Sequence, residues 1–319
     1  MASRDGNGWV RCAEGHRHWG RFGAAGLLAY VPSGPVLLQR RTWWSHHGGT
    51  WGLPGGARDS HESALAAALR EAAEECGVPA GAVRPSAVFT DDHGGWAYTS
   101  VLAEAAEPFA VLSDDDETDE VAWVAVPNVD GLDLHPGFAT HWPELRGELS
   151  PLTILVDGAN VVGSRPDGWW RDRAAAASRL RRELAPLVAE GITDLPDGAA
   201  PPGDGVPVSK AGSGRKQRGH SAWKRMRWMP DVVLVLEGGA RAAAAGATDS
   251  PVRIVAADGS GDDVIAGLAA QTGGRRIVVT ADRELRQRCI AAGATVAGPS
   301  WLLGLMTANA KNGQPLDCR

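Results

Sequence analysis

Hydrophobic and polar positions form short strand-like runs through the first half of the chain. The apolar runs at residues 24–31 (AAGLLAYV) and 35–41 (PVLLQRR) are joined by a Pro-Ser-Gly turn, so they predict two neighbouring strands. Further strands are expected over residues 85–92, 97–105 and 120–126, and a short helix over 138–147. Together these elements predict a mixed sheet with helices packed against it.

The pattern changes after a break near residues 147–151, where Gly and Pro interrupt it. Apolar strands follow at residues 152–157, 231–237, 252–258 and 275–282, and they alternate with helical segments at 170–190, 262–270 and 283–293. This alternation is typical of a parallel, doubly wound sheet that is buried on both faces. A chain of 319 residues is long enough for two domains of roughly 150 residues each.

Composition and charge limit the kind of surface and the cell compartment that we expect for this protein. The formal net charge of -6 argues against a wholly basic surface for nucleic acid. The four cysteines lie far apart without a CxxC pair, and no run approaches the roughly 18 apolar residues that span a bilayer. We therefore expect a cytoplasmic protein with no membrane segment.

One stretch departs from this charge balance. Residues 191–230 are rich in Pro and Gly and show no clear period, and residues 206–230 contain lysines and arginines but no acid. Such a basic insertion, which also carries Trp223 and Trp228, has the composition of a loop that contacts RNA. A solvated loop without a ligand is the alternative.

A helix near residue 60 carries an unusual density of acids. Asp59 with Glu62 predicts a capping box at its start, and Gly77 predicts its end. Its apolar stripe, which should face the sheet, consists of Leu65, Leu69, Ala72 and Cys76. Glu71 and Glu75 share a different edge with Glu74 beside them, and like charges at this spacing repel. The helix is therefore either an ordinary charged surface or a site for a cation.

The segment 55–78 (GGARDSHESALAAALREAAEECGV) resembles the signature of the Nudix family. The matching residues are Gly56, Glu62, Arg70, Glu71, Ala72, Glu74, Glu75, Gly77 and Val78. The resemblance implies an α/β/α sandwich over residues 17–147 that hydrolyses a nucleoside diphosphate linked to another moiety. It also implies that Glu71, Glu74 and Glu75, with the backbone near Gly55 or Gly56, bind Mg²⁺ or Mn²⁺.

The same resemblance leaves the general base open. Arg70 and Glu62 would orient the metal-binding cluster by charge-assisted hydrogen bonds. The base would be Glu74, or a loop carboxylate such as Glu117 or Glu120. That acidic loop could equally be a solvated turn.

Acids also follow the strands predicted in the second half. These are Asp157, Glu237, Asp262 with Asp263, and Asp282. The carboxyl ends of parallel strands meet at one edge of a sheet, so these acids could converge on a metal ion there. The alternative is that they are helix N-caps, as Asp282 and the pair Ser260 and Asp263 would allow.

The segments ILVDGANVVG, VLVLEGGAR, SGDDVIAGLA and VVTADRELR resemble the NYN group of PIN-like nucleases, including YacP-like ribonucleases. The resemblance covers residues 151–305 and implies that Asp157, Glu237, Asp262 and Asp282 bind Mg²⁺ for phosphodiester cleavage. Asn160 would be a polar partner of Asp157, and Asp263 an additional ligand. Glu237 departs from the Asp expected after its strand, and the insertion at 191–230 is longer than the compact pattern.

Two further groups of residues have more than one explanation. Arg40, Arg41, Trp43, Trp44 and Trp51 precede the acidic helix and could clamp a phosphate and stack on a base, although core or rim packing is the preferred interpretation of any single Trp. Cys12, His16 and His18 could bind zinc, but a closed structural site needs a fourth ligand, so ordinary packing is the preferred interpretation.

The sequence thus predicts a two-domain α/β hydrolase that depends on Mg²⁺ or Mn²⁺. The first domain would be a pyrophosphohydrolase for a nucleotide or for a capped or 5′-phosphorylated RNA end, and the second a ribonuclease. One alternative keeps the first activity but makes the second half a non-catalytic RNA-binding module. Another makes the chain a nucleotide-sensing regulator.

Overall fold

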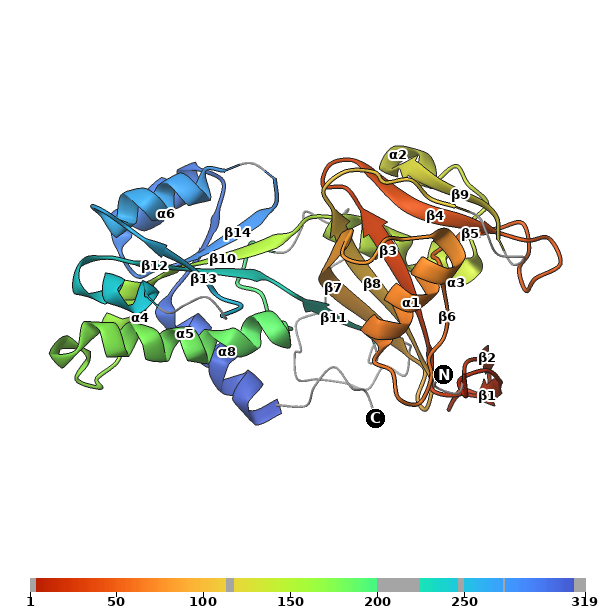
Figure 1. Cartoon of the computed structure of the whole chain (residues 1–319), viewed down its shortest axis with the longest axis horizontal. Helices are drawn as coiled ribbons and strands as arrows, with labels where there is room; N and C mark the ends of the chain where they lie inside the picture. The colour runs from red at the N-terminus through yellow and green to blue at the C-terminus, as the bar shows by residue number, and fades with distance from the viewer. Residues whose placement is uncertain (1–3, 113–117, 200–223, 246–249, 272, 313–319) are drawn as a thin grey trace, which may run out of the picture. The chain divides into compact units, whose positions relative to one another are not determined.

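The computed structural model describes residues 4–112, 118–199, 224–245, 250–271 and 273–312 (Figure 1). The chain forms two compact units, one built mainly from Met1–Leu149 and the other mainly from Ser150–Ala200 and Arg227–Pro315. Among the described helices, none has the length and apolar character needed to cross a membrane.

The first unit is built around a mixed sheet with the strand order β11-β7-β8-β3-β4-β5, in which β6 also pairs with β3 and β9 with β4. Its strands are β3 (Ala24–Tyr30), β4 (Pro35–Arg41), β5 (Trp51–Gly52), β6 (Gly55–Ala57), β7 (Val83–Asp92), β8 (Ala97–Ala105), β9 (Thr118–Ala125) and β11 (Lys224–Trp228). Strands β3 and β8 are parallel, whereas β4 and β9, like β7 and β8, are antiparallel. A separate hairpin consists of β1 (Trp9–Arg11) and β2 (Arg17–Trp19).

Helix α1 (Ala64–Cys76) covers one face of this sheet, and α3 (Pro136–Leu145) lies on the other (Figure 1). The short helices α2 (Val126–Val129) and η1 (Arg146–Glu148) flank α3. The face under α1 buries the following residues of the helix and the sheet: Ala67, Ala68, Ala72, Cys76, Leu27, Leu37 and Val101. Small alanines on the buried side let the helix backbone lie close to the strands.

The ends of α1 differ in part from the prediction. Gly77 ends the helix in the left-handed conformation at φ 65°, as expected. The start at Asp59 is wrong, because the N-cap is Ser63, whose side chain accepts a hydrogen bond from Ala66 N at 3.1 Å. Asp59 instead accepts a hydrogen bond from Gly6 N, so it fixes the N-terminal segment and does not cap the helix.

The second unit contains a parallel sheet with the order β13-β12-β10-β14-β15. Its strands are β10 (Leu152–Asp157), β12 (Asp231–Leu236), β13 (Arg253–Ala256), β14 (Arg275–Val279) and β15 (Thr295–Ala297). Its helices are α4 (Gly158–Gly163), η2 (Trp169–Arg171), α5 (Arg173–Ala189), η3 (Gly238–Ala244), α6 (Gly261–Ala269), α7 (Arg283–Ala291) and α8 (Pro299–Asn312).

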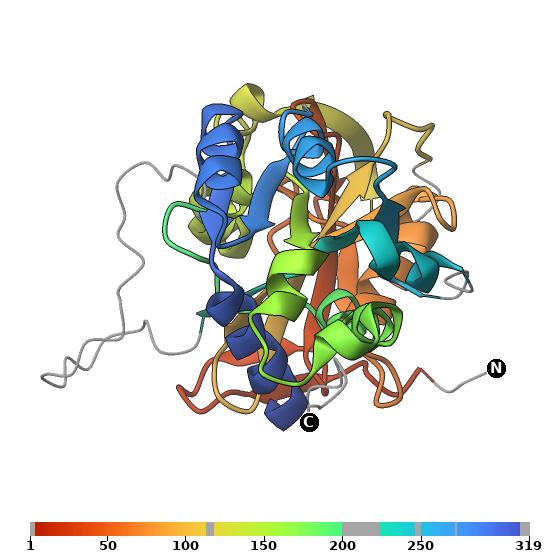
Figure 2. The same cartoon turned by 90° about the vertical axis from the view of Figure 1, so that its left-hand side faces the viewer.

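Helices cover both faces of this parallel sheet, as Figure 2 shows. Ile154 and Val156 of β10 pack toward α4, α5 and α8, whereas Leu155 packs toward α6 and α7. This alternation follows from the two-residue period of a strand and explains why the strands read as continuous apolar runs. The predicted α/β fold class, with a mixed sheet followed by a parallel sheet, is confirmed.

Candidate active sites

The three glutamates near the end of α1 differ strongly in exposure. Glu75 is buried, with 6% of its surface exposed, Glu71 is partly buried and Glu74 is exposed. The prediction that Glu75 lies on an edge apart from the sheet-facing stripe is wrong. Glu75 follows Ala68 and Ala72 by seven and three residues, so the helical period places it on the buried side with them.

Two donors hold the buried carboxylate. Gly55 N donates to Glu75 Oε2 at 2.7 Å, and the side-chain amide of Gln39 donates to the same oxygen at 3.0 Å. Gln39 lies on β4, so the strand and the segment before the helix both fix the position of Glu75. This contact depends on a residue far from the helix in sequence.

Arg70 connects the other acids of the cluster. Its guanidinium donates to both oxygens of Glu62 at 2.6 and 2.9 Å, and to Glu71 Oε1 at 2.7 Å. It also reaches Glu74 Oε2 at 3.2 Å and the carbonyl of Ala57 at 3.2 Å. A planar guanidinium can satisfy several acceptors at fixed angles, so Arg70 sets the orientation of Glu62 and Glu71 together.

The electrostatics of this cluster suit a cation. Burial, followed by the charge of Glu71, raises the pKa of Glu75 to about 8, and burial also raises the pKa of Glu71. A β-carbon added to Gly56 would lie 2.7 Å from Glu71 Oε1, so a glycine is needed for the carboxylate to lie against the backbone there. Two desolvated carboxylates beside exposed backbone form a donor set that hard divalent ions prefer.

Glu120, one of the candidate general bases, is not part of this cluster. It pairs with Arg40 across β4 and β9, and the two side chains form an ion pair of 3.3 Å. Successive residues of a strand point to opposite faces, so Arg40 and Glu120 lie on the face opposite to Gln39 and Glu75. The sequence could not show which face Glu120 occupies. The other loop candidate, Glu117, lies outside the described residues.

A pocket of about 480 Å³ lies beside the cluster, and Gly55, which donates to Glu75, forms part of its wall. Apolar and aromatic groups dominate the lining, including Leu53, Tyr98 and Phe138. Arg41 is the member of the predicted phosphate and stacking group that lines this pocket. Trp43 and Trp44 are 82% and 55% exposed, so core packing does not explain them.

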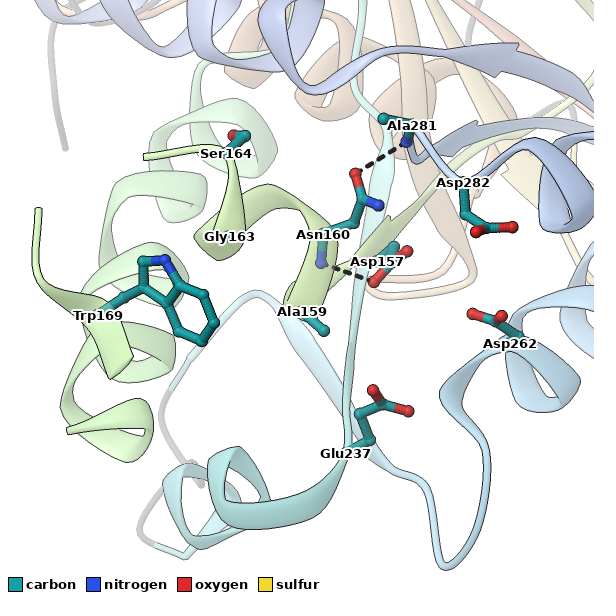
Figure 3. A pocket seen from close by; sticks show the side chains of 10 residues that line it. All are labelled: Asp157, Ala159, Asn160, Gly163, Ser164, Trp169, Glu237, Asp262, Ala281 and Asp282. Carbon is teal, nitrogen blue, oxygen red and sulfur yellow. Dashed lines mark hydrogen bonds between the residues drawn. The ribbon is translucent and has the colours of Figure 1, made fainter. Parts of the chain in front are cut away.

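The acids of the second unit converge on a different pocket, of about 520 Å³ (Figure 3). Figure 3 shows four carboxylates around one hollow at the carboxyl ends of the strands: Asp157, Glu237, Asp262 and Asp282. These acids therefore lie close together, as the parallel order of the strands predicts. Asn160 and Trp169 line the same pocket.

Hydrogen bonds fix three of these acids. Asp157 accepts from Thr280 Oγ1 at 2.8 Å and from Asn160 N at 3.0 Å. Glu237 accepts from Gly261 N at 2.8 Å, and Asp282 accepts from Leu285 N, so Asp282 also caps α7 as expected. The capping and pocket-lining interpretations of Asp282 are therefore compatible.

The acids of the second pocket include groups with raised pKa values, as do the acids of α1. Burial raises the pKa of Asp157 and, together with the charge of Asp157, raises the pKa of Asp262. Asp263 does not line the pocket; it forms a 2.7 Å ion pair with Arg288. Ser260 is the N-cap of α6 without a side-chain cap bond, so the predicted box of Ser260 and Asp263 is wrong.

Residues 206–223 make up most of the predicted RNA-contacting loop, and they lie outside the described residues. Residues 224–228 form β11, which is next to β7 in the first sheet. RNA contact through this segment stays a prediction.

Comparison with known proteins decides the family of the first unit. The family model described as the NUDIX domain matches residues 20–144. A protein of Mycobacterium tuberculosis, named "Putative 8-oxo-dGTP diphosphatase 3", is 47% identical over 160 residues, which are 47% of this chain and 72% of that protein. The chain belongs to the Nudix family.

Two solved structures are also similar to the chain. The Nudix hydrolase RenU from M. smegmatis is 49% identical and covers 44% of this chain and 93% of its own, with a TM-score of 0.41. Rae1 (YacP) from Bacillus subtilis is 16% identical and covers 50% of this chain and 77% of its own, with a TM-score of 0.33. At these TM-scores neither likeness decides anything further.

Membership makes the chain a Nudix hydrolase. Enzymes of this family act on nucleoside diphosphate derivatives and generally use divalent ions such as Mg²⁺ or Mn²⁺. Glu71 and Glu75 of α1, which we call the Nudix helix from here on, fit that requirement in charge and donor type.

Proposed function

We propose that residues 17–147 form a pyrophosphohydrolase domain that cleaves a nucleoside diphosphate derivative. The observation that carries this proposal is the desolvated pair Glu71 and Glu75: burial raises the pKa of both, which supports a cation as the partner of their charges. The intact cluster around Arg70 supports turnover over a purely nucleotide-sensing role.

Glu71, Glu74 and Glu75, with the backbone of Gly56, would hold Mg²⁺ or Mn²⁺. Such an ion, when bound, neutralises pyrophosphate oxygens and makes water a better nucleophile. Arg70 keeps Glu62 and Glu71 oriented, and Gln39 with Gly55 keeps Glu75 in place. Glu74 is the exposed acid of the group, so we assign it the role of accepting the proton of the attacking water.

The pocket beside Gly55 would bind the nucleoside part. Its volume of about 480 Å³ and its apolar and aromatic wall suit a base, and Arg41 supplies a positive charge for a phosphate. The name of the M. tuberculosis relative makes an oxidised guanine nucleotide the first substrate to examine. A capped or 5′-triphosphorylated RNA end is the second.

Hydrolysis by the wild-type chain and by Glu75→Gln, with Mg²⁺ or Mn²⁺, tests this assignment on a panel of nucleotides and RNA ends. The exposed Glu107 offers a matched control, Glu107→Gln. We expect Glu75→Gln to lose at least about a hundredfold in kcat and Glu107→Gln to match the wild type. Equal phosphate release by all three proteins would refute the assignment.

We further propose that residues 151–305 form an NYN/PIN-like ribonuclease domain that depends on Mg²⁺ or Mn²⁺. Four carboxylates around one pocket support this, because such a group needs a cation to offset its repulsion. Asp157, Glu237, Asp262 and Asp282 would hold the ion, and through it Asp157 and Asp282 would position the scissile phosphate and the water. The alternative, an RNA-binding module without catalysis, is favoured by Glu237, which stands where the related pattern has Asp.

Cleavage and binding of 5′-labelled RNA by wild type, Asp157→Asn and the exposed control Asp194→Asn distinguish these two functions. Loss of cleavage with retained binding in Asp157→Asn alone supports a nuclease. Binding without cleavage in all three proteins supports the non-catalytic module. Cleavage that survives Asp157→Asn unchanged removes the nuclease assignment.

A further inference from the structure

One cysteine and three histidines meet at the N-terminal hairpin, apart from both acidic sites. Cys12, His16, His18 and His93 each offer one donor atom, and these four atoms lie within 4.8 Å of one another. The first three belong to the β1–β2 hairpin, whereas His93 lies in the turn between β7 and β8. The fold therefore supplies the fourth donor that the local sequence lacks.

Hairpin geometry explains why the first three residues are neighbours. Cys12 and His16 face each other across a tight turn, in which Cys12 N donates to His16 O at 3.1 Å and Gly15 N donates to Cys12 O at 2.9 Å. His16 ends the turn, and His18 lies two residues further along, in β2, so the two rings come close together. The ring centroids of the two histidines are 6.3 Å apart.

The turn that carries His93 is fixed to this hairpin. Ala13 N donates to Gly94 O at 2.7 Å, and a β-carbon on Gly94 would lie only 2.8 Å from the β-carbon of Ala13. Gly94 also has a φ of 72°, so glycine is required there for both space and conformation. The result is a distance of 4.7 Å between the rings of His18 and His93.

Within the described part of the chain, one of the four side chains carries a buried nitrogen without a partner, and another is a buried thiol outside any disulfide. His18 Nε2 is buried and has no hydrogen-bond partner among the described residues. The thiol of Cys12 is free, and the residue is only 6% exposed. His18 also stacks on Trp96, with ring centroids 3.9 Å apart and planes at 13°. An orphaned nitrogen in an otherwise well-ordered contact requires an explanation.

Carboxylates contact the other two histidines in a way that suits metal ligands. Asp91 Oδ2 lies 3.1 Å from His93 Nε2, and Glu14 Oε2 lies 3.6 Å from His16 Nδ1. Each contact leaves the second ring nitrogen available. Histidines that bind metals usually donate their other N–H to a carboxylate or carbonyl, which orients the ring and makes it more basic.

We propose that Cys12, His16, His18 and His93 form a tetrahedral zinc site that joins the N-terminal hairpin to the β7–β8 turn. Thiolate with imidazole is a donor set for Zn²⁺, not for the Mg²⁺ of a carboxylate site. Bonds of about 2.0–2.3 Å place tetrahedral donors roughly 3.3–3.8 Å apart, so the present cluster would tighten only slightly. Binding releases the thiol proton of Cys12 to solvent.

The proposed zinc ion would stabilise the structure and would also affect the 480 Å³ pocket beside the Nudix helix. Four protein ligands leave no open position for a substrate or a reacting water. His18, His93 and Trp96 also belong to the wall of the 480 Å³ pocket, so a bound ion would fix that wall. Loss of zinc should therefore raise KM more than it lowers kcat. The zinc content itself is independent of the proposed reaction.

The test measures zinc in the full chain without a histidine tag, after exchange into buffer with excess Mg²⁺ to clear the carboxylate sites. The variants are Cys12→Ser and His93→Gln. The controls are Cys289→Ser, a buried free cysteine in the second unit, and His61→Gln, an exposed histidine of the separate group Asp5, Asp59 and His61, which tells whether zinc binds there instead. Co²⁺ in place of zinc provides a second readout, because tetrahedral thiolate ligation gives visible bands and a near-ultraviolet charge-transfer band.

We expect about one zinc ion per chain in the wild type and in both controls, and at least a tenfold lower content in each site variant. The Co²⁺ protein should lose its charge-transfer band in Cys12→Ser. The wild-type measurements remain decisive even if a variant folds poorly. A zinc-free wild type that also gives no charge-transfer band with Co²⁺ overturns the proposal. Zinc retained by both folded site variants overturns it as well.

Discussion

The amide of Gln39 donates a 3.0 Å hydrogen bond to Oε2 of Glu75 and so ties the Nudix helix to strand β4 through a buried carboxylate. Gly55 N donates to the same oxygen at 2.7 Å. Both contacts stabilise the ionised form, whereas burial and the charge of Glu71 raise the pKa of Glu75 to about 8. The balance of these effects sets how much of Glu75 is ionised at neutral pH, and the ionised form is the one that the proposed cation needs.

Removing the Gln39 donor should shift that balance. Gln39→Met keeps the volume but loses the hydrogen bond, so we expect the pKa of Glu75 to rise further in the metal-free protein. A hydrogen bond to a charged group is worth about 1.5–3 kcal/mol, which corresponds to a shift of roughly one to two pKa units. The measurement is the pH dependence of kcat/KM at fixed Mg²⁺, whose acidic limb should move to higher pH.

The control for this prediction is Tyr30→Phe. It removes another buried hydrogen bond of the same unit, from Tyr30 to Ser86 Oγ at 2.9 Å, without touching Glu75. It should lower thermal stability but leave the pH profile in place. An unchanged profile in Gln39→Met would show that this contact does not tune Glu75.

Local patterns in the sequence predict many of the strands and helices correctly. The apolar runs at 152–157 and 231–237 predicted β10 and β12 to within one residue, because buried parallel strands have few polar positions. Gly77 marked the end of α1 because a left-handed C-cap favours glycine. The helix α8 was missed, since Gly304 and polar residues interrupt its apolar period.

Contacts between distant segments could not be predicted in this way. The hydrogen bond that holds Glu75 comes from Gln39 of β4, and the face occupied by Glu120 depends on the register of β4 and β9. His93 likewise joins Cys12 only because the β7–β8 turn lies against the hairpin. The spacing of residues in the sequence predicts one helix or strand at a time, whereas these contacts form only when several helices and strands pack together.

The buried glutamate should also leave a signature in stability. Its pKa is raised from 4.5 to about 8 in the folded protein, so the folded state holds the proton more tightly. Stability of the metal-free chain should therefore fall as pH rises from about 4.5 to about 8, by up to ~1.4 kcal/mol per pH unit from this group. Glu75→Gln removes this contribution, and thermal unfolding between these pH values measures the difference in slope.

Mg²⁺ provides the control for this stability effect. The ion should raise the Tm of the wild type more at pH 8 than at pH 6, because the ionised carboxylate binds it, and should affect Glu75→Gln much less. Parallel curves of Tm against pH for the two metal-free proteins would contradict the burial argument.

The close approach of Gly56 to Glu71 gives a prediction about geometry. In Gly56→Ala the new methyl group would lie 2.7 Å from Glu71 Oε1 and push the carboxylate away. We expect at least a tenfold loss in kcat and a weaker apparent affinity for Mg²⁺, with a smaller effect on stability. Gly131→Ala is the matched control, since its methyl group meets Asn128 O at an ordinary 3.5 Å. Equal activity of both variants would contradict a role for this contact.

Two neighbouring acids of α6 allow a similar test in the second unit. Asp262 lines the pocket with a raised pKa, whereas Asp263 pairs with Arg288 at 2.7 Å. A cation in the pocket should displace protons from Asp157 and Asp262, so its affinity should weaken as pH falls. Calorimetry with Mn²⁺ in buffers of different ionisation enthalpy measures this release in a Glu75→Gln background, which removes the proposed Nudix site.

Asp262→Asn should reduce both affinity and proton release, and Asp263→Asn should change neither. If Asp263→Asn weakens binding as much as Asp262→Asn, the ion is held outside the pocket and the assignment of its ligands is wrong.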